Sequence, residues 1–230
     1  MSKPTISKKI LLWYDNNKRI LPWRKNTSKE QKLYFTLVSE FMLQQTQVST
    51  VIPYFKRFVQ KIPNFKKLSK ANDQTLMKLW EGLGYYSRAR NLKKSAIMIN
   101  CKFGGILPSN FEDLKSLPGI GDYTSTAIMA IAFNQKFIPL DGNVERILKR
   151  VLYLRNEKDI SKENMQISKK FFGLSERASD YAQAIMELGA LVCRPTSPLC
   201  EKCPISMNCI SYKRKDFSLI KKTKKIRSNI

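Results

Sequence analysis

Four cysteines lie within a stretch of seventeen residues near the C-terminal end of the sequence. They are Cys193, Cys200, Cys203 and Cys209, separated by six, two and five residues. Four thiolates at this spacing can close on one metal centre, so the segment must fold back around a common point. Zinc and an iron–sulfur cluster both remain open. The long first spacing and the intervening prolines are unlike the paired knuckles of a zinc ribbon and favour a [4Fe-4S] cluster.

A disulfide framework is the alternative use of these cysteines. The cysteines gather at one end of a sizeable chain, and the sequence shows no secretory signal pattern. Both features are atypical of secreted domains that are stabilised by disulfides. The fifth cysteine, Cys101, stands alone and is expected to be a reduced structural thiol. We therefore expect a cytoplasmic protein.

The charge of the chain indicates a polyanionic partner. Lysine and arginine exceed aspartate and glutamate by 24, and the pI is near 10. Such an excess in a well-patterned chain most often serves nucleic-acid binding, although a general drift toward lysine could supply part of it. The longest apolar runs, such as 127–133, fall short of the roughly 20 residues that cross a bilayer, so we expect no membrane partner.

Histidine is absent, and this restricts the chemistry. A Ser/His/Asp triad, a Cys/His pair and a histidine zinc site are all excluded. Proton transfer near neutral pH must then use a carboxylate with a raised pKa, or a lysine or cysteine with a lowered one.

The hydrophobic pattern predicts an all-α chain of about ten helices. Apolar residues recur at steps of three and four, with proline or glycine between the periodic segments, and strand signals are almost missing. The segments are 6–14, 34–46, 48–60, 75–82, 88–100, 124–133 and 143–152. We expect a central helical unit at 26–136, a cluster-bearing unit made of 1–25 and 137–212, and a basic tail at 213–230.

A glycine hairpin between two helices is expected at Leu117-Pro118-Gly119-Ile120-Gly121. Gly119 and Gly121 would let the chain turn tightly with exposed backbone N–H groups, and the next helix would add the positive end of its dipole. This arrangement holds a DNA phosphate without reading sequence. An ordinary inter-helix turn is the alternative.

Two carboxylates are candidates for catalysis. Glu40 is the only acid in a largely apolar helical segment, a placement that would raise its pKa and suit a proton donor; the alternative is a solvated residue on the polar face. Asp141 precedes a helical pattern, where an aspartate is commonly an N-cap.

Together these motifs resemble the adenine DNA glycosylases of the helix-hairpin-helix superfamily, over residues 6–212. The motifs that carry the resemblance are Leu21-Pro22-Trp23-Arg24, Ser39-Glu40 with Met42-Leu43-Gln44-Gln45-Thr46-Gln47, the run from Gly82 to Leu92, the glycine hairpin, Leu140-Asp141-Gly142-Asn143-Val144 and the four cysteines. The resemblance implies a six-helix barrel with a cluster-bearing helical domain. It also implies a monomeric base-excision enzyme of the nucleoid that removes adenine mispaired with 8-oxoguanine or guanine in double-stranded DNA.

The resemblance assigns roles to individual residues. Glu40 would protonate adenine N7, Asp141 would stabilise the sugar cation, and Asn143 would help to hold the site. Such an enzyme must flip its base out of the helix. The resemblance implies that Gln45, Thr46 and Tyr85 line the wedge that enters the stack, and that Leu21, Trp23, Arg24 and Gln183 are similar in position to adenine-pocket residues. The residues expected to bind DNA or the adenine are Leu21, Trp23, Arg24, Gln44, Gln45, Thr46, Tyr85, Arg88, Gly119, Gly121 and Gln183, with core packing as the alternative for Trp23 and Tyr85.

Tyr123 decides the expected reaction type. Related lyases carry a Schiff-base lysine at this position, so we expect a monofunctional hydrolase. The four cysteines would hold a structural [4Fe-4S] cluster. Compared with the family, we expect the usual further domain after 212 to be missing and an insertion at 25–32 to reshape the pocket wall beside Arg24.

Three alternatives stay open. A thymine glycosylase acting on G·T mismatches shares Gly121-Asp122-Tyr123 and the lack of the further domain. A lyase-type endonuclease is disfavoured by Tyr123 and Glu40. A DNA-binding protein that has lost its activity is disfavoured because both carboxylates are kept.

Overall fold

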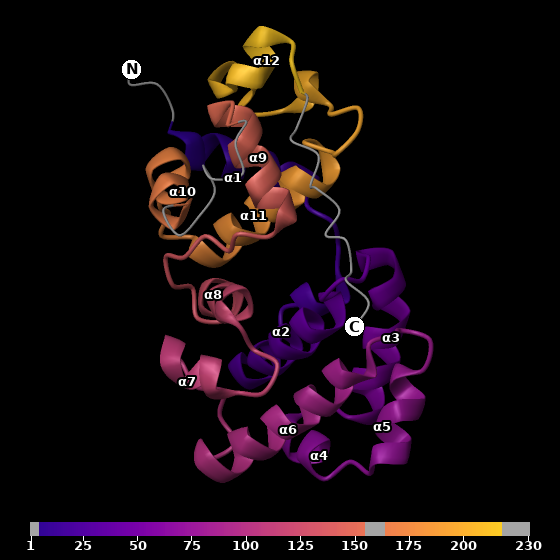
Figure 1. Cartoon of the computed structure of the whole chain (residues 1–230). Helices are drawn as coiled ribbons and strands as arrows, with labels where there is room; N and C mark the ends of the chain where they lie inside the picture. The colour runs from indigo at the N-terminus through magenta and orange to yellow at the C-terminus, as the bar shows by residue number, and fades with distance from the viewer. Residues whose placement is uncertain (1–4, 155–163, 218–230) are drawn as a thin grey trace, which may run out of the picture. The chain divides into compact units, whose positions relative to one another are not determined.

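The computed structural model describes residues 5–154 and 164–217. Throughout these residues the regular structure is helical and no strand occurs, which confirms the predicted all-α class (Figure 1). The part of the expected basic tail beyond 217 lies outside the described residues. No helix in the described ranges is long and apolar enough to span a membrane.

The chain forms two compact units. The larger unit consists of 18–139 and 175–182, so it includes the whole expected central segment and also residues 18–25. The smaller unit consists of 1–17, 140–174 and 183–230. The expected domain boundaries stay a prediction.

The larger unit is built from one 3-10 helix and α-helices of 5 to 17 residues. They are η1 (Pro22–Arg24), α2 (Lys29–Leu43), α3 (Val48–Lys61), α4 (Phe65–Ser69), α5 (Asp73–Trp80), α6 (Tyr86–Lys102), α7 (Phe111–Ser116) and α8 (Asp122–Ile131).

Side-chain caps explain where several of these helices begin. Asn64, Asn72 and Asn110 precede α4, α5 and α7, and each side chain accepts a hydrogen bond from the backbone N–H three residues on, at 2.7–2.8 Å. Ser28 caps α2 in the same way. Each cap satisfies a donor that the first helical turn leaves unpaired.

α2 lies at the centre of the core of the larger unit. Its residues from Leu33 to Met42 are buried except for Phe35, and the helix packs against α3, α6 and α8. The largest fully buried side chain of the core is Trp80 of α5. Because α2 is enclosed by its neighbours, its C-terminal end is a rigid base for the turn that follows.

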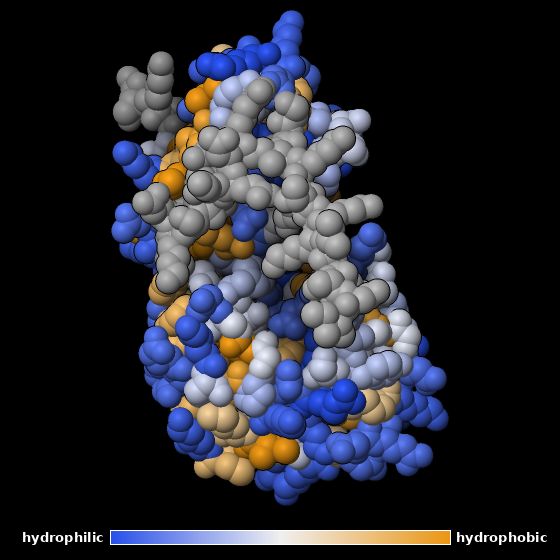
Figure 2. All heavy atoms as spheres, in the orientation of Figure 1, coloured by the Kyte–Doolittle hydropathy of each residue, from blue (hydrophilic) through white to orange (hydrophobic). Residues whose placement is uncertain are grey.

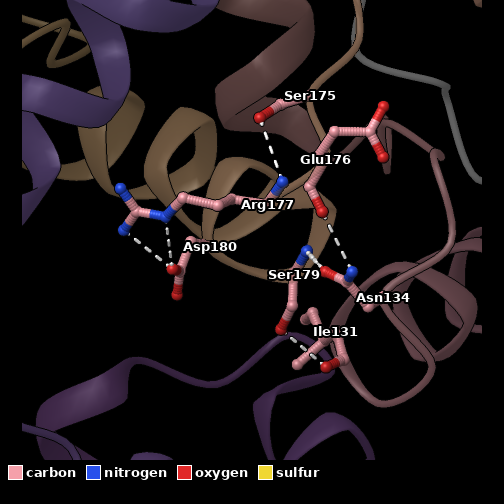
Figure 3. A network of polar contacts seen from close by, with 7 residues as sticks. All are labelled: Ile131, Asn134, Ser175, Glu176, Arg177, Ser179 and Asp180. Atoms are coloured by element: carbon pink, nitrogen blue, oxygen red, sulfur yellow. Dashed lines mark hydrogen bonds and ion pairs between the residues drawn. The ribbon is translucent and has the colours of Figure 1, made fainter.

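A polar network holds the start of α11 (Ala178–Leu191) against the loop after α8 (Figure 3). Asn134 Nδ2 donates to the Glu176 carbonyl, and Asn134 Oδ1 accepts from the Ser179 backbone N–H at 2.9 Å. Ser179 Oγ donates to the Ile131 carbonyl at 2.7 Å. Asn134 therefore links two segments of the larger unit that are distant in sequence.

The smaller unit contains α1 (Ile6–Asn17), α9 (Gly142–Leu152), α10 (Asn164–Phe172), the later part of α11, η3 (Cys200–Lys202), η4 (Ser206–Asn208) and α12 (Ile210–Arg214). The buried face of α9 carries Val144, Ile147, Leu148 and Val151, at the spacing of one helical face. α9 packs against α12.

Candidate functional site

Glu40 lies near the C-terminal end of α2 and is only 8% exposed. The alternative of a solvated residue on the polar face is therefore wrong. The helix ends just after Leu43, and the Gln44 backbone N–H still donates to the Glu40 carbonyl. The buried carboxyl and the exposed turn beyond it are thus separated by a single helical turn.

Two residues predicted to enter the DNA stack lie in left-handed turns of the larger unit. Gln45, after α2, has φ 57°, and Tyr85, before α6, has φ 49°. Both are exposed, Tyr85 by 61%, so core packing of Tyr85 is wrong. Thr46 follows Gln45, and its hydroxyl donates to the Gln44 carbonyl. A residue other than glycine at positive φ is uncommon, and such residues cluster at functional sites.

Arg88, predicted to bind DNA, is 7% exposed and lies behind these turns. Its Nη1 donates to the carbonyls of Phe41, Met42 and Gln44, the second at 2.9 Å. Its Nη2 donates to the carbonyls of Leu83 and Gly84 at 3.2 and 3.1 Å. The guanidinium thus connects the end of α2 with the loop before α6.

The predicted glycine hairpin joins α7 to α8. Gly119 has φ +82°, and an added Cβ would lie 2.9 Å from both Asn91 Cβ and Phe41 Cε1. Gly121 is different, since its φ is −98° and nothing lies within 4 Å of an added Cβ. Only Gly119 needs to be glycine for the fold, whereas Gly121 leaves open space in front of the α8 N-terminus.

Polar contacts hold the hairpin to its neighbours. Gln44 Nε2 donates to the Gly119 carbonyl at 3.3 Å, and Ser95 Oγ of α6 donates to the Pro118 carbonyl at 2.9 Å. Tyr123, in the first turn of α8, is 37% exposed. Gln44 therefore supports the hairpin from within the larger unit.

The segment predicted to line the adenine pocket forms η1. Leu21 is buried, and the half-buried Trp23 packs edge-on against Phe55 with ring centroids 5.3 Å apart. This contact supports core packing as one role of Trp23. Arg24 is half-buried, and its Nη1 lies 3.4 Å from the Arg19 carbonyl.

Asp141, in the smaller unit, is the N-cap of α9, as its position in the sequence indicates. Its Oδ1 accepts from the backbone N–H groups of Asn143 and Val144 at 2.9 and 2.7 Å. Its Oδ2 accepts from Asn143 Nδ2 at 2.9 Å. The carboxylate is held by three donors. Gln183, predicted to bind DNA or the adenine, lies in the same unit and is buried in α11.

Arg146 connects Asn143 with the first cysteine. Its Nη2 donates to Asn143 Oδ1 at 2.7 Å, and its Nε donates to the Cys193 carbonyl at 2.7 Å. α9 approaches α11 closely here, since an added Cβ on Gly189 would lie 2.6 Å from Asn143 Cβ. A continuous polar path therefore runs from Asp141 through Asn143 and Arg146 to the Cys193 backbone.

The four cysteines line one pocket in the smaller unit, together with Arg150 and apolar side chains. Arg150 is 2% exposed, and its Nη1 lies 3.3 Å from Cys193 Sγ. Its Nε has no hydrogen-bond partner among the described residues. Across the described ranges no group of three or more His, Cys, Asp or Glu side chains is placed to hold a metal ion.

The chemistry of these donors fits a metal centre. Burial, and then the neighbouring thiolates, raise the pKa of Cys203 to about 12 and also raise the pKa values of Cys200 and Cys209. A cationic centre would remove this penalty because it favours the thiolate form. Arg150, buried beside Cys193, is a further compensating charge.

The sequence interpretation did not assign functions to Arg146 and Arg150. Asn143, Arg146 and Arg150 are spaced by three and four residues, so they share one face of α9. That spacing was visible in the sequence and could have connected the Asp141 motif with the cysteines.

The chain belongs to the HhH-GPD superfamily of base excision DNA repair proteins, whose family description matches residues 38–172. It is 43% identical to the adenine DNA glycosylase of Rattus norvegicus over 216 residues, which are 89% of this chain and 41% of the rat protein. It is 40% identical to the adenine DNA glycosylase of Buchnera aphidicola subsp. Schizaphis graminum over 96% of this chain and 64% of that protein. The chain thus spans less than two thirds of the length of these curated relatives.

Solved structures agree with this family. A thermostable thymine-DNA glycosylase has a TM-score of 0.79 and 26% identity, covering 90% of this chain and 95% of that one. An endonuclease III in a non-covalent DNA complex has a TM-score of 0.73 and 22% identity, covering 91% and 94%, and shows the shared fold. The predicted helix-hairpin-helix glycosylase fold is confirmed.

Proposed function

We propose that the protein is a monofunctional DNA glycosylase that hydrolyses the N-glycosidic bond of adenine mispaired with 8-oxoguanine or guanine in double-stranded DNA. The observation that carries the proposal is the similarity to adenine DNA glycosylases at about 40% identity over most of this chain. The net charge of +24 suits a DNA partner. A monomer acting on chromosomal DNA in the cytoplasm, at the nucleoid, is part of the same proposal.

Glu40 is the proposed general acid. Departure of adenine requires a proton on the base, and Glu40 would place it on N7 and then act as base toward the attacking water. Its burial at the end of α2 supports this role, because an enclosed carboxyl can meet a flipped base away from bulk water.

Asp141 is the proposed stabiliser of the sugar cation. A carboxylate held by three N–H donors stays oriented, which is what a developing positive charge requires. Asn143 holds one oxygen of this carboxylate, and Arg146 holds Asn143 in turn. Both would act as positioning residues.

The four cysteines, Cys193, Cys200, Cys203 and Cys209, are the proposed ligands of a [4Fe-4S] cluster. Such a cluster would supply a structural cross-link at this point, which ties together segments that are otherwise joined by short 3-10 helices. Arg146 and Arg150 would connect this region with α9 through the backbone around Cys193.

The test is single-turnover base release from three matched duplexes, which carry adenine opposite 8-oxoguanine, adenine opposite guanine, and thymine opposite guanine. Native protein should release adenine from the first two, and Glu40→Gln should abolish release without loss of DNA binding. Tight binding without release from any duplex would contradict the proposal.

Thymine release is the second candidate function, favoured by the structural similarity to a thymine-DNA glycosylase. That similarity carries 26% identity, against 43% for the rat adenine enzyme. Release from the third duplex alone would establish thymine as the substrate.

A further inference from the structure

Two exposed left-handed turns share one buried cation. Gln45 and Tyr85 are far apart in sequence, yet the carbonyl that precedes each of them, on Gln44 and Gly84, accepts a hydrogen bond from Arg88. The other acceptors of Arg88 are the carbonyls of Phe41, Met42 and Leu83. All five acceptors are backbone atoms, so Arg88 acts on the path of the chain and not on particular side chains.

The position of Arg88 agrees with the electrostatics of a helix end. The last carbonyls of α2 have no partner within the helix and form the negative end of its dipole. A guanidinium supplies both positive charge and a planar fork of donors. Nη1 reaches the end of α2 while Nη2 reaches the loop before α6.

Arg88 is also packed between aromatic rings. Its guanidinium carbon lies 5.3 Å from the ring centroid of Tyr85 and 5.7 Å from that of Trp80. Trp80 Nε1 donates to the Gly84 carbonyl, so the same loop is held from a second direction. The guanidinium thus contacts one face of the Tyr85 ring while 61% of the residue stays exposed.

Both turns depend on outside support. A residue other than glycine at positive φ is strained, and a tyrosine there is uncommon. Tyr85 is the N-cap of α6 but makes no side-chain cap hydrogen bond, and nothing in its own side chain favours the left-handed form. The hydrogen bonds of Arg88 to the adjacent carbonyls compensate for this strain.

We propose that Arg88 is a positioning residue that fixes Gln45 and Tyr85, two residues of the wedge that the resemblance implies, in one preformed arrangement before the target base leaves the duplex. The identity of the extruded base, adenine, rests on the proposed function. The extrusion step itself does not. A wedge that is already ordered adds no ordering cost during base flipping. Loss of Arg88 should therefore slow extrusion and leave the rate of bond hydrolysis at Glu40 unchanged.

Arg88→Lys is the decisive variant, because lysine keeps the charge but cannot reach both sets of carbonyls with a planar fork. Arg90→Lys is the matched control, since Arg90 is an exposed arginine on the same helix. The probe is a duplex with 2-aminopurine in place of the adenine opposite 8-oxoguanine. At saturating protein, stopped-flow fluorescence reports extrusion directly, and adenine release from the normal duplex is measured in parallel.

We expect Arg88→Lys to slow the fluorescence rise by about 100-fold, with Arg90→Lys close to native. Partial unfolding would instead lower the amplitude at an unchanged rate. In a Gln45→Ala, Tyr85→Ala background, Arg88→Lys should produce no further slowing, because the wedge it holds is gone. The inference would be overturned if Arg88→Lys extruded the base at the native rate. It would also be overturned if Arg88→Lys slowed extrusion as much in the double-alanine background as in native protein, or if native protein gave no fluorescence rise.

The two proposals fail in different ways. Extrusion of 2-aminopurine without adenine release would contradict the proposed function and leave the inference about the wedge intact.

If Arg88→Lys does not fold, Gln45→Val and Gln45→Asn test the same wedge. Valine disfavours the left-handed turn and should slow extrusion, whereas asparagine tolerates the turn and should retain more of the rate. Equal rates in the two variants would overturn the inference.

Discussion

Asn143 Nδ2 donates a hydrogen bond to Asp141 Oδ2 at 2.9 Å while Asp141 Oδ1 caps α9. One carboxylate thus performs two tasks with different oxygens. The sequence offered N-cap and catalytic carboxylate as competing interpretations of Asp141, but the geometry permits both. Substitutions that affect the two oxygens differently can separate the tasks.

Asp141→Asn should abolish base release while keeping most of the stability. An asparagine can still cap α9 through its oxygen, but its amide would face the Nδ2 donor of Asn143. Asp141→Ala should remove the cap as well and destabilise the protein by about 0.5–2 kcal/mol. Urea unfolding and single-turnover release measure the two effects. Equal destabilisation by Asn and Ala would contradict the capping role.

Gly119→Ala should destabilise the protein by about 1–3 kcal/mol, because alanine is strained at positive φ and its methyl would overlap Asn91 and Phe41. The hairpin should be displaced, and affinity for DNA should fall with it. Gly121→Ala is the control for stability, since its Cβ meets nothing within 4 Å. Thermal unfolding of both variants measures the difference, and equal melting temperatures would contradict the steric argument.

Cys200→Ser should remove the visible absorption of an iron–sulfur centre and lower the thermal stability, because three ligands hold such a cluster poorly. Cys101→Ser is a matched control, since Cys101 is exposed and lies in the larger unit. Absorption spectra and iron analysis of both purified variants provide the test. A colourless native protein that contains zinc would overturn the choice of metal.

The sequence predicted the helical class and the motifs well, because hydrophobic periodicity and proline or glycine breaks report local structure directly. The tertiary roles of arginines were not predictable in the same way. Arg88 stands in a basic motif, which favours a contact with DNA, yet it is buried and donates to five backbone carbonyls. Every residue has a backbone carbonyl whatever its side chain, so the sequence could not indicate which carbonyls accept hydrogen bonds from Arg88.

Tyr34→Phe tests the packing of α2 through pH. Burial raises the pKa of Tyr34 above its ordinary value, and its hydroxyl donates to the Ile62 carbonyl. Because the folded pKa is raised, the stabilising contribution of the neutral phenol is complete below about pH 10 and is lost as the pH rises further. Native protein should lose stability in that range for this reason.

Phenylalanine removes both the hydrogen bond and the ionisation. The variant should therefore be less stable than native by about 1 kcal/mol at pH 7, with a difference that narrows above pH 10. Urea midpoints at several pH values measure this difference. Tyr86→Phe, at an exposed tyrosine, should leave the midpoint at pH 7 unchanged. A difference for Tyr34→Phe that does not vary with pH would contradict the argument.

Asp122→Asn should strengthen DNA binding at low salt. Asp122 stands in the first turn of α8, directly after the hairpin, and its carboxylate lies 2.6 Å from Lys115 Nζ. The pair is exposed, so it adds little stability, but Asp122 opposes an approaching phosphate and occupies the lysine. Removal of the acid frees Lys115 to contact a phosphate.

The salt dependence of DNA binding measures this effect. The affinity of native protein should fall by about 1,000-fold between 50 and 200 mM salt, and the plot of log affinity against log salt concentration should be steeper by about one in the variant. Fluorescence anisotropy over this range tests both statements: a flat native dependence would contradict binding to the DNA backbone, and an unchanged slope in Asp122→Asn would show that Lys115 does not contact phosphate.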